Sequence, residues 1–560
     1  MINLVKSKQA HQQNPPHQQT RSTADCPVSF IASSVLLLIE VDPLVREQEV
    51  STMMVEFIID YTLNRHFLYQ LTATLTTLLL IRTILFLQAR HRRYQLFKYY
   101  GIPGPKPNLF EGNLGIYNKR PFTYEMAKEI NDRYGSTFGV FIGDEPVLFT
   151  TDLEILRKVF LTDMKSFGAR ATVFLSEPIG NNSILFAEHN RWKFFRKHMS
   201  PAFNRYTVRG ESSTLFIEDT IRLALDYIDK RLDPDESGKM TTNIDMHELM
   251  KSAALHVISS VAVKLPDVQV SEHDRYVSSL DAYLSTADKG IVEWAIRVPL
   301  FRTILSFLAR NIDDATLAII KAKLIAAINE YAKQASNSTE VKRDDQQNQV
   351  IDTLIRLHHE GKMSRDDVLG NAYAILFAGY DTTSTTLTYI FWVLAKHTQI
   401  QDKLRADLIA HGTDSKYLEQ VINETMRLYP TVLSFTTRLA TEHVKYDSLT
   451  IPKGTKVVHQ AWIIQRDPRI WPEPMKFDPE RFAEGKTHHP CAFAPFGLGE
   501  RRCLGYQLAM LEMKMILCDI VIRYRLRLKS PMQLEQVTYA VVLSKPLEKV
   551  MVELERISTG

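Results

Sequence analysis

Helical periodicity dominates the pattern of apolar and polar positions in this chain. Only near the start do two β-rich runs occur, Thr137–Ile142 and Val147–Thr150, on either side of the slightly long turn Gly143–Pro146. Elsewhere apolar residues recur every three to four positions, which predicts helices at 153–161, 190–200, 212–231, 314–334, 365–396, 399–410, 416–428 and 506–520. The pattern predicts one large, mainly α domain with a small β region.

The longest predicted helix, 365–396, changes character at its middle. Ser364 and Asp367 form a capping pattern at its start. Residues 372–379 are nearly all apolar, and residues 381–386 are one Asp followed by Thr and Ser. Buried hydroxyls need partners, so this cluster predicts a local opening where a small ligand and water sit. The structural alternative is that the hydroxyls bond to carbonyls one turn back.

The segment Phe67–Leu87 is apolar and long enough to cross a bilayer core of ~30 Å. Its one charge, Arg82, lies near the C-terminal end, where the side chain can reach the interface. A positive flank follows at 90–93, and such flanks stay cytoplasmic. We therefore expect a transmembrane anchor at 67–89, with a buried core helix as the alternative, and a basic, Pro- and Gly-rich linker at 90–107.

Composition narrows the class of protein. The 560 residues are 45% hydrophobic and 24% charged, with a net charge of +4, which gives no general reason to expect nucleic acid. Four scattered cysteines do not form a disulfide framework, so a reducing compartment is expected. Residues 1–66 read as an N-terminal extension of disordered or uncertain structure.

The strongest chemical signal is the run from Phe496 to Gly505, which contains Cys503 just before the helix predicted at 506. Helix dipole, loop N–H groups and nearby Arg501 and Arg502 all favour the thiolate. A thiolate in such a loop can be the axial ligand of haem iron, with Phe496 shielding the sulfur. The alternative is an inert buried cysteine.

This run resembles the haem loop of the cytochrome P450 family, Phe-x-x-Gly-x-Arg-x-Cys-x-Gly, at each fixed position: Phe496, Gly499, Arg501, Cys503 and Gly505. The resemblance covers roughly four-fifths of the chain. It implies the cytochrome P450 fold, mainly α with a small β region, preceded by the N-terminal transmembrane helix. Residues 108–560 would be the haem-thiolate catalytic domain, with haem b held by Cys503.

Further motifs follow in the family's order. In the run Ala378-Gly-Tyr-Asp-Thr-Thr383, the resemblance implies that Thr382 steadies oxygen at the iron and that Asp381 helps relay protons. It also implies a structural network behind the haem loop, formed by Glu424, Arg427 and Arg481.

The same resemblance implies that the haem propionates are bound by Trp192, Arg196, Arg438 and Arg501. Arg438 depends on the variable spacing after Pro430. By analogy, substrate contacts come from Thr172–Phe186, from Phe377, Ala378 and Thr382, from Val432–Thr436 and from Val541–Leu543.

The implied activity is insertion of one atom of O2 into a lipophilic substrate, such as a xenobiotic, steroid or fatty acid. The residues of these motifs resemble those of animal microsomal members of the family, in the branch that includes drug- and steroid-oxidising enzymes and thromboxane synthase. The chain has no convincing dinucleotide fingerprint. The implied electron donor is therefore a separate NADPH–cytochrome P450 reductase, with cytochrome b5 as a further candidate partner. The expected location is the endoplasmic reticulum membrane, single-pass, with the catalytic domain cytosolic.

Three alternatives remain, one of which is a haem-binding sensor without turnover. A haem-thiolate isomerase or dehydratase of lipid peroxides would need neither O2 nor a reductase, although Asp381 and Thr382 argue against it. A zinc-binding module would use His488, His489, Cys491 and Cys503, whose spacing lacks the paired pattern of zinc sites.

Overall fold

The computed structural model describes residues 43–117, 122–170, 183–263, 268–271, 275–286, 318–337, 350–434, 436–529, 534–539 and 543–557. Contacts divide the chain into two compact units, Met1–Leu85 and Phe86–Gly560. Below, these are called the N-terminal unit and the C-terminal unit.

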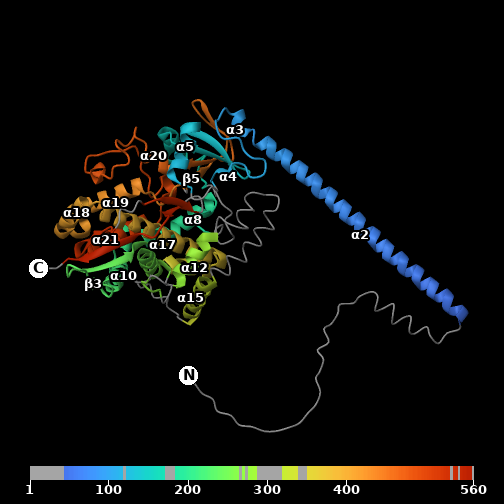
Figure 1. The fold of residues 1–560 in the computed structure, drawn as a ribbon, viewed down its shortest axis with the longest axis horizontal. Coiled ribbons are helices and arrows are strands. Elements are labelled where there is room, and N and C mark those ends of the chain that lie inside the picture. Colours follow the sequence, from blue (N-terminus) through green and yellow to red (C-terminus); the bar gives the residue numbers. More distant parts are fainter. Residues whose placement is uncertain are drawn as a thin grey trace, which may run out of the picture. The chain divides into compact units, whose positions relative to one another are not determined.

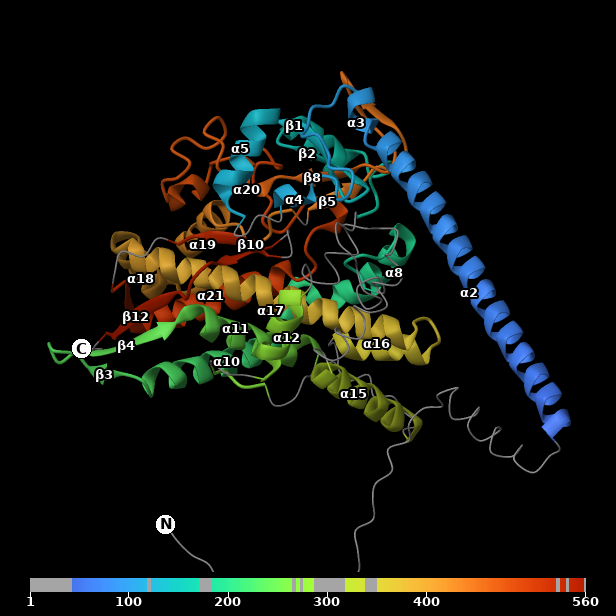
Figure 2. The same ribbon diagram turned by 45° about the vertical axis from the view of Figure 1, so that its right-hand side comes forward.

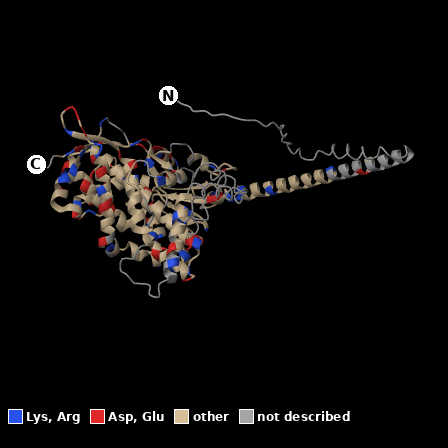
Figure 3. Ribbon diagram, turned by 90° about the horizontal axis from the view of Figure 1, so that it is seen from below, with Lys and Arg blue, Asp and Glu red and all other residues tan. Residues whose placement is uncertain are grey.

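The described part of the N-terminal unit is helical. Helix α2 runs from Pro43 to Arg93 and so continues into the C-terminal unit. It begins well before the anchor predicted at 67–89. Residues 43–66, which were assigned above to an extension of uncertain structure, are helical as well. Over Arg65–Tyr99 the chain is helical, long and apolar enough to cross a membrane. Figure 3 shows most of the described part of α2 in tan, the colour of residues other than Lys, Arg, Asp and Glu.

The segment predicted as a basic linker is packed into the C-terminal unit. Arg90 is buried and pairs with Asp144 at 2.6 Å. Tyr94 donates a hydrogen bond to the carbonyl oxygen of Gly143 at 2.9 Å. The ring of Phe97, in the short helix α3 (Leu96–Tyr99), lies so close to Gly139 that a Cβ there would come within 2.4 Å. Arg90 is therefore an internal ion-pair partner and does not belong to the exposed positive flank.

Helices make up most of the C-terminal unit (Figure 1). Their bounds are α4 Leu114–Tyr117, α5 Tyr124–Tyr134, α6 Leu153–Arg157, α8 His189–Met199, α9 Arg205–Val208, α10 Glu211–Asp229, α11 Met246–Ile258, α12 Arg275–Thr286, α15 Ala318–Asn337, α16 Val350–His359, α17 Arg365–Lys396, α18 Thr398–His411, α19 Lys416–Leu428, α20 Ala461–Ile464 and α21 Tyr506–Arg523. The ends predicted for α17 and α19 are confirmed. The helix predicted at 153–161 ends at Arg157 and continues as a π-helical turn, Lys158–Thr162.

The strands form small sheets, as the sequence predicts. The described strands are β1 Thr137–Ile142, β2 Glu145–Thr150, β3 Asp233–Pro234, β4 Met240–Asp245, β5 Thr437–Leu439, β6 Val444–Tyr446, β7 Leu449–Ile451, β8 Lys456–His459, β9 Tyr524–Arg527, β10 Gln536–Tyr539, β11 Leu543–Pro546 and β12 Met551–Arg556. They pair in the orders β1-β2-β8-β5, β3-β4-β12-β9, β10-β11 and β6-β7.

The hairpin β1–β2 has a shorter turn than the sequence suggests. Ile142 pairs with Glu145 and Phe141 with Pro146, so only Gly143 and Asp144 form the turn. Gly143 has a φ of 61°, a conformation that glycine adopts without strain. The tight turn fixes the register that buries β1 and β2 against the neighbouring helices.

Helix α17 runs through the centre of the C-terminal unit, with α11 and α12 beside it (Figure 2). The predicted capping box is present: Ser364 and Asp367 each accept a hydrogen bond from the other's backbone N–H. Most of the helix is buried. A Cβ on Gly379 would lie 2.6 Å from the side chain of Ile258 on α11, so glycine at this position lets the two helices approach closely.

Candidate active site

The loop that carries Cys503 is held by backbone geometry that needs glycine. The N–H of Cys503 donates to the carbonyl oxygen of Phe496 at 2.7 Å. Gly499 has a φ of 65°, and a Cβ there would lie 2.2 Å from the carbonyl oxygen of Phe160. Gly505 differs, because a Cβ there would meet nothing within 4 Å. The protein's own packing therefore requires glycine at 499, whereas open space at 505 suits a flat ligand passing close to the backbone.

Cys503 combines an accessible sulfur with surroundings that favour the thiol. Its side chain is exposed, yet the protein atoms around it still replace much of the bulk water. This burial raises the pKa of the Cys503 thiol, against the backbone N–H groups of Gly505 and Tyr506 and the charges of Arg196 and Arg170. The prediction that the loop alone favours the thiolate is therefore wrong in sign. A bound metal cation would reverse this pKa shift, because coordination deprotonates a thiol outright.

Four arginines surround this loop, and we call them the arginine cluster: Arg170, Arg196, Arg438 and Arg501. Arg501 donates to the carbonyl oxygens of Gly168 and Ala187 at 3.0 and 3.2 Å. Arg438, on β5, donates to the carbonyl oxygen of Leu498 at 2.8 Å. Burial lowers the pKa of both guanidiniums to about 10, and the nearby charge of Arg501 contributes to the shift at Arg438.

Within the described residues, two nitrogens of this cluster are buried without a hydrogen-bond partner, Nε of Arg438 and Nη1 of Arg501. The described hydrogen bonds of both side chains go to backbone carbonyls and not to carboxylates. Buried cations call for anionic partners. The cluster therefore fits a ligand that brings carboxylates, as haem does with its propionates.

Trp192 and Arg196 reach the same cluster from α8. The indole ring of Trp192 is buried, and the guanidinium carbon of Arg501 lies 4.5 Å from its centroid. Arg196 donates to the carbonyl oxygen of Arg502 at 3.0 Å. The structure thus brings together the four residues that the resemblance assigns to the propionates. Their role as ligands remains a prediction.

The predicted opening in α17 has a counterpart in the exposure of its residues. Ala378 is exposed, and Phe377, Gly379 and Thr382 are partly exposed, in a helix that is otherwise mostly buried. The Oγ1 of Thr382 donates to the carbonyl oxygen of Ala378 at 2.6 Å, which is the structural arrangement that the sequence left open. Asp381 is buried. Thr382 thus combines an accessible side chain with a local hydrogen bond.

Glu424, Arg427 and Arg481, here called the Glu424 network, form a buried ion cluster. Glu424 and Arg427 are fully buried and make a two-pronged contact, at 2.7 and 2.9 Å. Nε of Arg481 lies 3.4 Å from Glu424. Arg427 also donates to the carbonyl oxygens of Gln465 and Pro474. Burial raises the pKa of Glu424, and both arginines oppose the shift. The network ties α19 to the chain segment ahead of the Cys503 loop.

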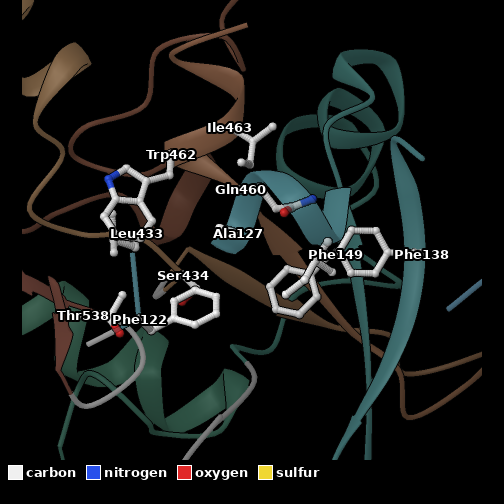
Figure 4. Close-up of a pocket in the computed structure, with 11 residues that line it drawn as sticks. Phe122, Ala127, Phe138, Phe149, Leu433, Ser434, Gln460, Trp462, Ile463 and Thr538 are labelled. Carbon is white, nitrogen blue, oxygen red and sulfur yellow. The ribbon is translucent and has the colours of Figure 1, made fainter. Parts of the chain in front are cut away.

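The predicted substrate segments lie only partly within the described residues, since 171–182, 435, 541 and 542 fall outside them. Leu433 and Ser434 line a small cavity of about 60 Å³. Its other lining residues are Phe122, Ala127, Ile130, Phe138, Phe149, Gln460, Trp462, Ile463 and Thr538. Figure 4 shows Trp462 and Leu433 on one side of it and Phe138 and Phe149 on the other. Thr436, at the end of the same predicted segment, lies beside the Cys503 loop, since a Cβ on Gly497 would come within 3.7 Å of its hydroxyl oxygen. The role of this segment in binding substrate stays a prediction.

Sequence reasoning missed two residues of the site. Phe160 lies in the π-helical turn, with the guanidinium carbon of Arg438 4.9 Å from its ring centroid. Arg170 donates to the carbonyl oxygen of Arg501 at 3.0 Å and stands among the other arginines. Neither residue belongs to a recognisable motif, so only three-dimensional proximity reveals them.

The zinc alternative finds no support in the described residues, which contain no group of three or more His, Cys, Asp or Glu side chains placed to hold a metal ion. His489 lies 3.4 Å from Glu154. His488 stacks on Trp471, with ring centroids 4.4 Å apart. Cys491 is buried, and burial raises its pKa to about 12.

Comparison with known proteins agrees with this geometry. Residues 102–552 match the sequence model of the family described as Cytochrome P450. Similar curated proteins include cytochrome P450 3A40 of Oryzias latipes, 29% identical over 484 residues, which cover 82% of this chain and 92% of that protein. Cytochrome P450 3A31 of Mesocricetus auratus is 28% identical over 514 residues, covering 86% and 97%. Cytochrome P450 3A41 of Mus musculus is 29% identical over 474 residues, covering 80% and 90%. This chain belongs to the cytochrome P450 family.

Proposed function

We propose that this cytochrome P450 monooxygenase oxidises a xenobiotic, steroid or fatty acid with electrons from NADPH–cytochrome P450 reductase. One atom of O2 enters the substrate, and the other leaves as water with two electrons from NADPH and two protons. The observation that carries the proposal is the accessible thiol of Cys503 together with two buried guanidinium nitrogens, Nε of Arg438 and Nη1 of Arg501, that have no hydrogen-bond partner within the described residues. A haem-thiolate enzyme needs both features, a soft axial ligand and an anchor for the propionates.

Haem b, when bound, would supply the oxidising chemistry, and the chain's own residues hold and orient it. Cys503 is the proposed iron ligand, on a loop shaped by Gly499 and shielded by Phe496. Trp192, Arg196, Arg438 and Arg501 would bind the propionates, joined by Arg170. The Glu424 network has the structural role of fixing the segment that leads to the loop.

Asp381 and Thr382 are the proposed proton-handling residues. The partly exposed Thr382 hydroxyl would hold a proton toward the reacting oxygen, and Asp381 would replenish that proton from its buried position on α17. General acid catalysis of this kind requires a donor within hydrogen-bond reach of the reacting atom. The bond from Thr382 to Ala378 keeps the hydroxyl close to the helix. To donate toward the reacting oxygen, the Thr382 hydroxyl must rotate its proton away from the carbonyl oxygen of Ala378, while its lone pairs can accept a proton from a neighbouring donor.

The proposed location is the endoplasmic reticulum membrane, with the C-terminal unit in the cytosol. The apolar helix Arg65–Tyr99 supports a membrane anchor. The exposed cations Arg92 and Arg93 support the orientation even with Arg90 buried.

The test combines purified protein, reductase, NADPH and a panel of lipophilic compounds, read by mass spectrometry. We expect a product heavier by one oxygen atom that depends on NADPH and carries label from 18O2. Thr382→Ala should keep the haem spectrum and release more hydrogen peroxide for each NADPH consumed. Conversion of a lipid peroxide without NADPH, together with no oxygenated product, would instead identify a haem-thiolate isomerase or dehydratase.

A further inference from the structure

A buried polar network holds the centre of α17 on the side of α11 and α12. The hydroxyl of Tyr380, which is fully buried, donates to Oδ1 of Asp281 on α12 at 2.7 Å. The other oxygen of Asp281 lies 2.8 Å from Nζ of Lys251 on α11. Lys251 also pairs with Glu248 at 3.0 Å. The carboxylate of Asp281 therefore joins three helices at one point.

A second contact between α11 and α17 lies next to the first. Ile258 packs against Gly379, where any Cβ would come within 2.6 Å of its side chain. Lys251 and Ile258 are seven residues apart on α11, so both face α17. The residue between the packing contact and Asp381 is Tyr380. Helix α17 is thus held by apolar contact at Gly379 and by a hydrogen bond to a carboxylate one residue later.

The stretch that these contacts hold is partly open to solvent and rich in hydroxyl side chains. Residues 377–379 and Thr382 are partly or fully exposed. The side chains of Thr382, Ser384 and Thr386 bond to backbone carbonyls of the same helix, at 2.6, 3.1 and 2.8 Å. Such bonds weaken and bend helices. Two polar contacts from outside the helix flank this stretch, the bond from Tyr380 to Asp281 and the contact of Thr386 with Thr431 at 2.9 Å. Of the two, the bond at Tyr380 lies next to Asp381 and so acts most directly on the rotation of residues 380–382.

We propose that Tyr380, Asp281 and Lys251 are positioning residues that fix the orientation of Asp381 and Thr382. The inference rests on the proton-handling roles proposed above for those two residues. Tyr380 acts through the backbone, since neighbouring residues of a helix turn together. Because Asp281 belongs to α12, the tether also makes the orientation of Asp381 and Thr382 depend on the position of α12.

The test compares two tyrosines of the same helix. Tyr380→Phe removes only the hydroxyl that bonds to Asp281. Tyr389→Phe is the matched control, because Tyr389 is also fully buried and its hydroxyl lies 3.3 Å from that of Ser544, on β11. Hydrogen–deuterium exchange over residues 376–386 is measured in the haem-loaded protein without NADPH. We expect several-fold faster exchange in Tyr380→Phe and parent-like exchange in Tyr389→Phe.

A functional readout and a double-variant cycle complete the test. In the presence of reductase and NADPH, Tyr380→Phe should divert several-fold more electrons to hydrogen peroxide than Tyr389→Phe does, at equal haem content. Asp281→Ala removes both the acceptor of the Tyr380 hydroxyl and the partner of Lys251, so its effect should be at least as large as that of Tyr380→Phe. Adding Tyr380→Phe to Asp281→Ala should have no further effect, because the bond between the two residues is already lost. Parent-like exchange in Tyr380→Phe, or equal effects of both tyrosine variants, would overturn the tether. If the parent forms no oxygenated product, the proposed function fails, while the exchange measurement still decides the tether.

Discussion

Two buried arginine groups of the C-terminal unit differ in how their charge is balanced. In the Glu424 network, the carboxylate accepts from Arg427 on two oxygens and faces Arg481 as well. In the arginine cluster, the described bonds of Arg438 and Arg501 reach carbonyl oxygens, and a nitrogen of each has no partner within the described residues. A buried ion group that is internally paired is complete as structure, whereas one with surplus cations needs a ligand. The comparison separates a structural role from a binding role.

The largest expected effect comes from replacing Cys503, the proposed iron ligand of the haem that the arginine cluster is proposed to bind. Cys503→Ser should abolish the thiolate-type carbon monoxide difference spectrum, because the soft anionic ligand is lost. The arginine cluster is unchanged in this variant, so it should still bind some haem. Survival of the thiolate spectrum in the Ser variant would show that Cys503 is not the iron ligand.

The comparison itself is tested by removing one arginine from each group. Arg427→Met should lower the free energy of unfolding by about 3–5 kcal/mol with or without haem, because it removes the two-pronged partner of the buried Glu424 and leaves only the longer contact with Arg481 to balance its charge. Arg438→Met should hardly change the stability of the apoprotein, because it removes a cation that burial and Arg501 already disfavour. It should instead speed the transfer of haem to an acceptor globin. Chemical denaturation and haem-transfer rates measure the two effects, and equal behaviour of both variants would remove the distinction.

The parts of the fold and of the candidate site that could be predicted from the sequence are those set by short, contiguous motifs. The ends of α17 and α19 are set by local signals, such as the capping box of Ser364 and Asp367, and so they were predictable. The glycine at 499 belongs to a contiguous motif. Arg170 and Phe160 were missed because their partners are distant in the chain, and distance in sequence carries no local signal.

The errors have a similar physical origin. The sign of the pKa shift at Cys503 depends on burial, which the loop sequence does not reveal. Arg90 reads as a solvated flank charge until Asp144 is found beside it. In both cases the local chemistry was interpreted correctly, and tertiary packing decided the outcome.

Glu512 on α21 extends the comparison to a buried acid that forms no ion pair within the described part of the chain. It is 3% exposed, and one carboxyl oxygen has no hydrogen-bond partner within the described residues. Burial raises its pKa well above the ordinary value of 4.5. The folded protein therefore keeps a proton that the unfolded chain loses, and stability falls as pH rises from 4.5 toward neutrality. Glu512→Gln stays neutral, so its stability relative to the parent should rise over that interval in denaturant titrations. A constant difference between pH 4 and pH 7 would contradict this assignment.

The smallest expected effect separates buried from exposed cations on a single helix. On α8, Arg196 is partly buried and bonds to the carbonyl oxygen of Arg502, whereas Lys193 and Lys197 are exposed. If the surface beside the Cys503 loop receives the reductase, Lys193 and Lys197 should steer an acidic partner toward it.

The double variant Lys193→Glu/Lys197→Glu should then slow the first electron transfer several-fold at low ionic strength. Added salt should slow the parent more than the variant, because screening removes attraction only where attraction exists. Haem content and substrate-induced spectral shifts should stay as in the parent. Stopped-flow reduction across a salt series measures the rates, and equal rates at low ionic strength would exclude this surface as the docking site.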